Sequence, residues 1–167
     1  MSSTDHRQHS PSSVSVHVIT ISDTRTIDTD ASGRLIVELL EGAGHRVAGR
    51  RLLRDDADQV RTTVATLTSE AQADVVITTG GTGITARDST FEAVDGLLTK
   101  RLPGFGELFR ALSYQQIGAA AMLSRATAGL VDRTVVIVLP GSQSAVRLAL
   151  EELVLPEIGH LVREARR

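Results

Sequence analysis

The sequence contains no cysteine, which excludes disulfide bonds, cysteine metal sites and thiol nucleophiles. Its basic residues are arginines with one exception, so that Lys100 is the only lysine. This excludes a catalytic lysine elsewhere, and also the lysine of a G-x-x-x-x-G-K-[ST] phosphate-binding loop. No apolar run approaches the roughly 20 residues that a membrane helix needs. Chemistry that depends on a thiol, on such a lysine or on a membrane span is therefore not expected.

The sequence also lacks an excess of charge of either sign. The 167 residues carry a formal net charge of -2, which favours neither a nucleic-acid nor a membrane partner. With 41% hydrophobic and 23% charged residues, the composition is typical of one soluble globular domain, which we expect to be cytoplasmic. Residues 1–13 are rich in serine and histidine and lack the apolar segment of a secretory signal. We predict a disordered tail over residues 1–13 and a folded domain over residues 14–167.

Strand-like and helix-like patterns alternate along the domain. β-Branched runs predict strands over residues 14–22, 45–53, 74–79 and 134–139. Helical spacing predicts helices near residues 32–42, 56–67, 89–98, 107–118 and 144–153, with a last one from Pro156. The first helix is expected to be capped by Ser32, and residues 103–106 are expected to be a loop. The alternation predicts an α/β three-layer sandwich with a mainly parallel sheet and helices on both faces.

A glycine-rich loop follows the third predicted strand, with the sequence Thr-Thr-Gly-Gly-Thr-Gly at residues 78–83. Glycines let the backbone approach a ligand closely, and successive N–H groups can hold an anion. Hydroxyl groups in the loop add hydrogen-bond donors. The candidate binding residues here are Thr79, Gly80, Gly81, Thr82 and Gly83. A tight turn between a strand and a helix explains the glycines equally well, and the loop matches neither the Rossmann nor the Walker pattern.

Carboxylates stand close to this loop and after the second strand. Asp88 suits a divalent metal and Arg87 suits a phosphate, but Asp88 is also well placed to cap the next helix. Asp55 and Asp56 follow the second strand, and paired carboxylates beside a phosphate crevice indicate Mg²⁺. An acidic helix start is the commoner explanation of such a pair. Metal ligands and helix caps therefore remain alternatives at both places.

Two more loops begin where a predicted strand ends. Ser22 and Asp23 follow the first strand, where they line a crevice or only cap a turn. Gly141 and Ser142 follow the last strand and enter a helix, whose N-terminus can bind an anion or simply be capped by the serine. In parallel sheets, ligands bind at the carboxyl ends of the strands, so one crevice can collect all of these loops. His17, inside an apolar strand, is predicted to be a core or interface residue rather than a ligand.

The order of these motifs resembles the MogA/MoaB family of molybdopterin-binding proteins. The resemblance rests on the glycine loop and on the Arg87-Asp88-x-Thr90-x-Glu92-Ala93 pattern that follows it. Shorter matching pieces occur at residues 19–23, 103–107 and 139–142, so that it covers about residues 14–160. Residues 112–118 and the Ser124-Arg-Ala segment are more similar to the MoaB branch than to the MogA branch.

The resemblance implies the molybdopterin-binding domain fold and a Mg²⁺- and ATP-dependent adenylation of molybdopterin that releases pyrophosphate. The two aspartates of the adenylating members fall on Asp55 and Asp88, as catalytic residues and Mg²⁺ ligands. Asp56 is the alternative to Asp55 in this role. The remaining candidates bind molybdopterin or ATP. They are Ser22, Asp23, Thr79, Gly80, Gly81, Thr82, Gly83, Arg87, Gly141 and Ser142.

The resemblance also implies partners and an alternative function. It implies a homotrimer or homohexamer, which hands its product to a molybdenum-inserting protein, in a molybdenum or a tungsten pathway. Some relatives lack the two aspartates and are catalytically idle, so an inactive molybdopterin-binding or scaffold protein of the same pathway is the alternative. This chain has both aspartates, which favours activity. A molybdenum-inserting relative is disfavoured by the length of the chain.

Overall fold

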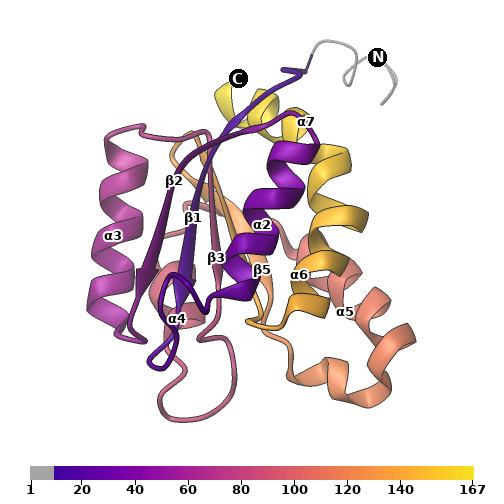
Figure 1. Ribbon diagram of the computed structural model, residues 1–167. Helices are drawn as coiled ribbons and strands as arrows, with labels where there is room; N and C mark the ends of the chain where they lie inside the picture. The colour runs from indigo at the N-terminus through magenta and orange to yellow at the C-terminus, as the bar shows by residue number, and fades with distance from the viewer. Residues whose placement is uncertain (1–9) are drawn as a thin grey trace.

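The computed structural model describes residues 10–167 and contains one mixed sheet with helices on both of its faces (Figure 1). Its six strands lie in the order β2-β1-β3-β6-β5-β4. In chain order the strands are β1 (Ser15–Ile21), β2 (Arg46–Leu53), β3 (Val75–Thr79), β4 (Lys100–Arg101), β5 (Thr127–Val131) and β6 (Thr134–Leu139). The predicted α/β sandwich with a mainly parallel sheet is confirmed.

The four predicted strands form the parallel part of the sheet. β1 pairs in parallel with β2 and β3, and β3 pairs in parallel with β6. β3 and β6 are buried along their whole length, as expected for β-branched strands that are covered on both faces. Because these four strands run in the same direction, their carboxyl ends meet at one edge of the sheet.

Two short strands were not predicted from the sequence. β5 runs antiparallel to β6 after a turn in which Asp132 has a φ of 52°, and β4 pairs antiparallel with β5. β4 has two residues, and β5 contains Gly129, whose Cβ would lie 2.3 Å from the carbonyl oxygen of Lys100. Short strands with an internal glycine give little periodic signal. Only the pairing of β5 with β6, and of β4 with β5, makes these segments strands.

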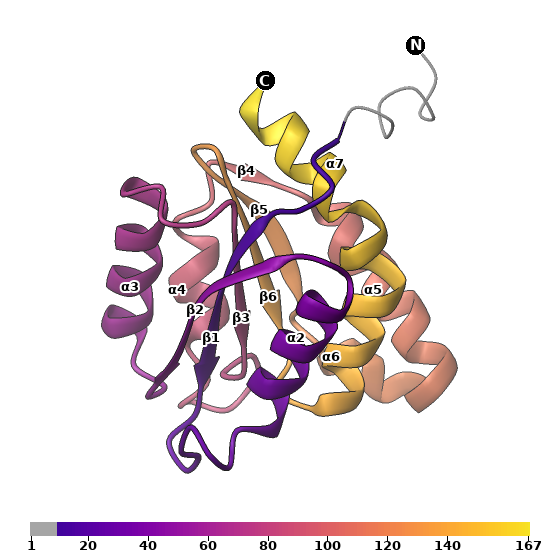
Figure 2. The same ribbon diagram turned by 45° about the horizontal axis from the view of Figure 1, so that its top comes forward.

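The helices divide between the two faces of the sheet (Figures 1 and 2). One apolar cluster packs beneath α2 (Ala31–Gly42), α5 (Pro103–Ile117), α6 (Gln143–Ala149) and α7 (Leu155–Arg166). The other packs beneath α3 (Ala57–Ser69) and α4 (Thr90–Asp95). A 3-10 helix, η1 (Gly118–Leu123), follows α5, and a π-helical segment, η2 (Leu150–Val154), joins α6 to α7.

Two helix starts differ from the sequence expectation. Asp30 rather than Ser32 caps α2, because its carboxylate accepts a hydrogen bond from the Gly33 N–H. α5 begins at Pro103 and so includes residues 103–106, which were expected to be a loop. Proline fits the first turn of a helix, where its missing N–H is not needed.

The predicted tail lies partly outside the described residues, which begin at residue 10. Ser10 and Pro11 lie against α7, where a Cβ on Gly159 would be 2.6 Å from the carbonyl oxygen of Pro11. Within residues 10–167, the helices are too short or too polar to cross a membrane.

Candidate functional site

Loops from four strands meet at the edge of the sheet where β2, β1, β3 and β6 end. Ser22, directly after β1, donates its N–H to the carbonyl oxygen of Leu53 at the end of β2 (2.8 Å). Gly80, directly after β3, donates its N–H to the carbonyl oxygen of Leu139 at the end of β6 (3.1 Å). The loops that the sequence singled out are therefore neighbours in the fold.

Two glycines of the loop after β3 use the conformational freedom of glycine in different ways. Gly80 and Gly81 have φ values of 99° and 64°. A Cβ on Gly80 would lie 2.2 Å from the carbonyl oxygen of Ile21, so this glycine lets the loop pass close to β1. A Cβ on Gly81 would lie 2.1 Å from Thr90 Oγ1 and 2.9 Å from Asp55 Oδ2. The tight-turn interpretation thus accounts for Gly80, while Gly81 lets two side-chain oxygen atoms approach the backbone of the loop.

Asp55 and Asp56 have separate environments. Asp56 caps α3, since its Oδ1 accepts a hydrogen bond from the N–H of Gln59 (2.8 Å). Asp55 points to the loop after β3 instead. Its Oδ1 accepts hydrogen bonds from the N–H and the hydroxyl of Ser89 (3.2 and 2.8 Å), and its Oδ2 faces Gly81. The acidic helix start therefore describes Asp56, and Asp55 is the carboxylate at the candidate site.

Asp88 belongs to the turn of the glycine-rich loop and does not cap α4. Its Oδ2 accepts hydrogen bonds from the N–H and the hydroxyl of Thr85 (2.9 and 2.6 Å), and a Cβ on Gly83 would lie 2.5 Å from the same oxygen. The Thr85 hydroxyl, then the N–H groups of Thr85 and Gly83 and the charge of Arg125, lower the pKa of Asp88 against a raising effect of burial. Asp88 is thus a carboxylate at neutral pH, beside the glycine-rich loop.

Asp23 links the first loop to the other two. Its Oδ2 forms an ion pair with Arg87 (2.5 Å), and its Oδ1 accepts a hydrogen bond from the N–H of Asp55 (3.2 Å). The Arg87 side chain is 74% exposed, so its guanidinium retains donors for an anion. The Ser22 hydroxyl oxygen accepts hydrogen bonds from two following N–H groups (3.3 and 3.1 Å), as in a capped turn.

The loop after β6 is held by hydroxyl groups from two neighbouring elements. Thr79, the last residue of β3, donates to the carbonyl oxygen of Pro140 (2.8 Å), and Ser32 in α2 donates to that of Gly141 (2.7 Å). Ser142 caps α6 through its side-chain oxygen, as the capping interpretation predicted. Gly141 and Ser142 are exposed and therefore accessible at the rim of the site.

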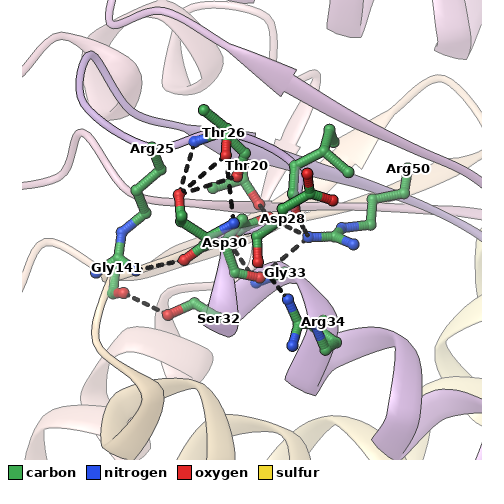
Figure 3. Close-up of polar contacts among 12 residues, drawn as sticks. Thr20, Arg25, Thr26, Asp28, Asp30, Ser32, Gly33, Arg34, Arg50 and Gly141 are labelled. Atoms are coloured by element: carbon green, nitrogen blue, oxygen red, sulfur yellow. Dashed lines mark hydrogen bonds and ion pairs between the residues drawn. The ribbon is translucent and has the colours of Figure 1, made fainter.

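A buried carboxylate fixes the loop between β1 and α2 (Figure 3). Asp30 is fully buried and accepts hydrogen bonds from the Thr20 hydroxyl (2.7 Å), the Gly33 N–H (2.9 Å) and the Arg50 guanidinium (2.8 Å). Burial alone would raise the pKa of Asp30, but the hydrogen bonds from Arg50, Thr20 and Gly33 and the charge of Arg50 together lower it. Arg50 also donates to the carbonyl oxygen of Ile27 within the loop (3.2 Å). This cluster joins β1, β2 and α2 behind the site.

Three residues at the site were missed by residue-by-residue reasoning. Ser89 has capping-box spacing to a glutamate, but it makes no capping bond and binds Asp55 instead. Thr90 is fully buried next to Gly81, and its hydroxyl has no hydrogen-bond partner among the described residues. Arg125 donates to carbonyl oxygens of the glycine-rich loop. The family-like motifs contain Thr90 and Arg125, but no local pattern marks either of them as a site residue.

The residues present fit a Mg²⁺ ion that arrives with a phosphate ligand. Within residues 10–167, no group of three or more histidine, aspartate or glutamate side chains is placed to hold a metal ion by itself. Mg²⁺ in proteins commonly takes one or two carboxylates and fills its other positions with substrate phosphates and water. Asp55 Oδ2 and the Thr90 hydroxyl, which has no partner among the described residues, both lie against Gly81, and Asp88 lies beside Gly83. These are oxygen donors of the kind that Mg²⁺ prefers.

Comparison with known proteins identifies relatives over nearly the whole chain. A family model described as "Probable molybdopterin binding domain" matches residues 17–160. Molybdenum cofactor biosynthesis protein B of Bacillus cereus is 50% identical over 168 residues, which cover 100% of this chain and 99% of that protein.

Solved structures agree with this match. A crystal structure of molybdenum cofactor biosynthesis protein B is 50% identical, has a TM-score of 0.91 and aligns over 95% of this chain and 99% of the other. The tungsten cofactor synthesizing protein MoaB from Pyrococcus furiosus is 40% identical, has a TM-score of 0.84 and aligns over 94% and 99%.

Proposed function

The chain belongs to the MogA/MoaB family of molybdopterin-binding proteins, and we propose that it acts in molybdenum cofactor biosynthesis by adenylating molybdopterin with Mg²⁺ and ATP. The observation that carries this proposal is the placement of Asp55 and Asp88 against the glycine-rich loop. One carboxylate faces Gly81 and the other faces Gly83, two residues further along. A protein that only bound molybdopterin would not need a pair of anionic groups next to an anionic ligand.

The proposed reaction is a nucleotidyl transfer. A terminal phosphate oxygen of molybdopterin attacks the α-phosphorus of ATP, the new P–O bond forms, and the bond to pyrophosphate breaks so that pyrophosphate leaves with the electron pair. Both substrates are anions, and the protein has to hold them together and offset their charge. No covalent enzyme intermediate is needed, in keeping with the absence of cysteine.

We assign the glycine-rich loop to the phosphate groups. The N–H of Gly80 already binds the carbonyl oxygen of Leu139, so its part is to bring the loop close to β1. The N–H groups of Gly81 and Thr82 are our candidates for phosphate donors. Arg87 adds an exposed guanidinium at the side of the loop. Thr79 and Gly83 shape the loop, and the pterin end of the substrate is assigned to Ser22, Asp23, Gly141 and Ser142.

The carboxylates are assigned to the cation on the ATP side. Asp55 and Asp88, together with the Thr90 hydroxyl, would hold Mg²⁺, which when bound supplies neutralisation of the charge on the phosphate oxygens. Ser89 holds Asp55 through Oδ1, which keeps Oδ2 turned to Gly81. Thr85 holds Asp88 in the same way through Oδ2. Each carboxylate is thus fixed in direction before a ligand arrives.

The test is incubation of the purified protein with molybdopterin and Mg·ATP, followed by detection of adenylyl-molybdopterin and pyrophosphate. Asp88→Asn and Asp55→Asn keep the shape of the side chain and remove one charge. We expect each to lower turnover at least ~100-fold, equivalent to about 2.7 kcal/mol, while molybdopterin binding survives. The double variant should be less than additive if both carboxylates serve one ion.

Asp56→Asn is the matched control, because it changes the neighbouring carboxylate and Asn is an equally good helix cap. It should leave turnover unchanged. Full turnover in both the Asp55→Asn and the Asp88→Asn variants would refute the catalytic assignment and leave an inactive molybdopterin-binding or scaffold protein as the better description.

We also propose that the chain works as a homotrimer or homohexamer and passes its product to a molybdenum-inserting protein. Large apolar side chains are exposed on α5 and η1. They are Leu108, Tyr114, Ile117, Met122 and Leu123. Such a patch is typical of a protein–protein interface. A monodisperse monomer in analytical ultracentrifugation at micromolar concentration would contradict the oligomer.

A further inference from the structure

Arg125 contacts both ends of the segment 82–88, which begins in the glycine-rich loop. Its Nε donates to the carbonyl oxygen of Thr82 (3.0 Å), and its Nη2 donates to those of Gly83 and Asp88, the latter at 3.5 Å. The segment is also tied to the fold by the Arg87–Asp23 ion pair and by the hydrogen bonds of the next residue, Ser89, to Asp55, while Ile84 is 70% exposed. One guanidinium therefore joins the start and the end of the segment that carries Asp88.

The Arg125 guanidinium is itself held in place from the other side. Its Nη1 forms an ion pair with Glu92, and the group lies 5.2 Å from the ring centroid of Phe91. Both residues belong to α4, which is packed on the sheet. The clamp therefore ties residues 82–88 to α4. An arginine suits this task because its planar group carries five N–H donors in a fixed fork.

The orientation of the peptide between Thr82 and Gly83 connects Arg125 to the side of the loop where Asp88 lies. The described residues contain no cis peptide bond, and in a trans peptide the C=O and the N–H point in opposite directions. Because Arg125 binds the carbonyl oxygen of Thr82, the N–H of the same peptide, that of Gly83, is turned away from Arg125. Gly83 itself lies against the Asp88 carboxylate, since a Cβ on Gly83 would be 2.5 Å from Asp88 Oδ2, so the orientation of this peptide bears directly on Asp88.

We propose that Arg125 is the positioning residue of the adenylation site, and that its clamp on residues 82–92 sets the direction of the Gly83 N–H and of Asp88. The role rests on the proposed function, but the clamp does not. Arg125 reaches the carbonyl side of the loop, so it acts through Gly83 and Asp88 and not by contact with the phosphates. A lysine at this position keeps the charge but has no fork to span Thr82, Gly83 and Glu92.

The first test measures the clamp without any substrate. Hydrogen–deuterium exchange, read by mass spectrometry over residues 80–92, is compared between the wild-type protein, Arg125→Lys and Arg101→Lys. Arg101 is a matched control because its guanidinium binds both the side chain and the backbone of Asp95, away from the loop. We expect exchange in residues 80–92 to rise about tenfold or more in Arg125→Lys only. Unchanged exchange in this variant would overturn the clamp.

The second test measures the consequence for turnover. Arg125→Lys should lower kcat roughly 10- to 100-fold with a small change in KM for ATP, and raise the Mg²⁺ concentration needed for half-maximal activity. Addition of guanidinium ion at millimolar concentration to Arg125→Ala should restore part of kcat, which a merely destabilised protein would not show. If Arg125→Lys does not fold, Glu92→Gln, which removes only the outer anchor, should show a smaller change in the same direction.

The outcomes separate this inference from the proposed function. Faster exchange in Arg125→Lys, with no adenylation by the wild-type protein, would support the clamp and refute the adenylation. Adenylation that is lost in Asp88→Asn but kept at the wild-type rate in Arg125→Lys would refute the positioning role alone.

Discussion

Asp30 and Asp88 are carboxylates whose pKa values are lowered in the fold, and the two lie in regions of very different construction. Asp30 is fully buried, and its partners Thr20 and Arg50 come from two other elements of the fold. Asp88 is partly exposed, and its hydrogen bonds come mainly from Thr85, three residues earlier. The direction of a pKa shift therefore does not separate a carboxylate that holds the fold from one that is available to a ligand.

The origin of the partners does separate them. The Asp30 cluster joins β1, β2 and α2, so its loss affects the packing of three elements (Figure 3). The turn around Asp88 is closed by short-range bonds and by the Arg125 clamp, so it can change while the sheet stays intact. Between these two carboxylates, the one that holds the fold has long-range, buried partners, and the candidate ligand has local partners at an accessible edge.

The largest effect that we expect from this comparison is on stability. Asp30→Asn leaves the Arg50 charge without its partner in a buried setting, which should lower the free energy of unfolding by about 3 kcal/mol. Asp88→Asn should change it by less than about 0.5 kcal/mol, because the site is at the surface. Urea denaturation at a fixed protein concentration measures both. The exposed ion pair of Asp58 with Arg61 is the control, and Asp58→Asn should cost under about 1 kcal/mol. Equal stabilities of the Asp30 and Asp88 variants would remove the distinction.

A second, smaller effect tests the same distinction between two neighbours. Asp56→Ala removes the cap of α3 and should lower the free energy of unfolding by about 1 kcal/mol. Turnover of the folded protein should be kept, whereas Asp55→Asn is expected to lose turnover and keep stability. The two variants are compared by thermal unfolding and by the adenylation assay. If Asp56→Ala abolished turnover at a temperature where it is fully folded, the assignment of Asp55 as the site carboxylate would be wrong.

An effect of similar size concerns pH and another buried group. His17 is 5% exposed, and neither ring nitrogen has a partner among the described residues; burial, and then the charge of Arg51, lower its pKa from 6.5. Below that ordinary value the unfolded chain binds a proton that the folded protein does not, so stability falls as the pH falls below about 6.5. Burial lowers the pKa of His45 as well, and this part of the slope remains in any His17 variant.

His17→Leu should therefore flatten the dependence of stability on pH without removing it. Between pH 7.5 and pH 5.5 we expect the variant to lose about 1 kcal/mol less than the wild-type protein, measured by urea denaturation at each pH. Identical losses in the two proteins would show that His17 is not the source. Asp30 acts in the same direction at lower pH: its stabilisation is complete above its ordinary pKa of 3.8 and is lost as the pH falls below that value.

Local patterns were sufficient to predict that the candidate loops meet at one edge of the sheet. Each candidate loop begins at the end of a predicted strand, and the parallel order of those strands brings the loops together. The choice between Asp55 and Asp56 was beyond the sequence, because either carboxylate can begin a helix. It was decided by the backbone turn after β2, which directs Asp56 to the N–H of Gln59 and Asp55 to Ser89.

The sequence by itself determined the parallel core, since β-branched runs with helices between them have few other ways to bury their side chains. It also excluded thiol chemistry and placed two aspartates near a glycine-rich loop. Only the tertiary structure decided that β4 and β5 extend the sheet, that Asp30 meets Arg50, and that Arg125 reaches Gly83, 42 positions earlier. Hydrophobic periodicity is a property of neighbouring residues, whereas the partner of a distant guanidinium depends on how the whole chain closes on itself.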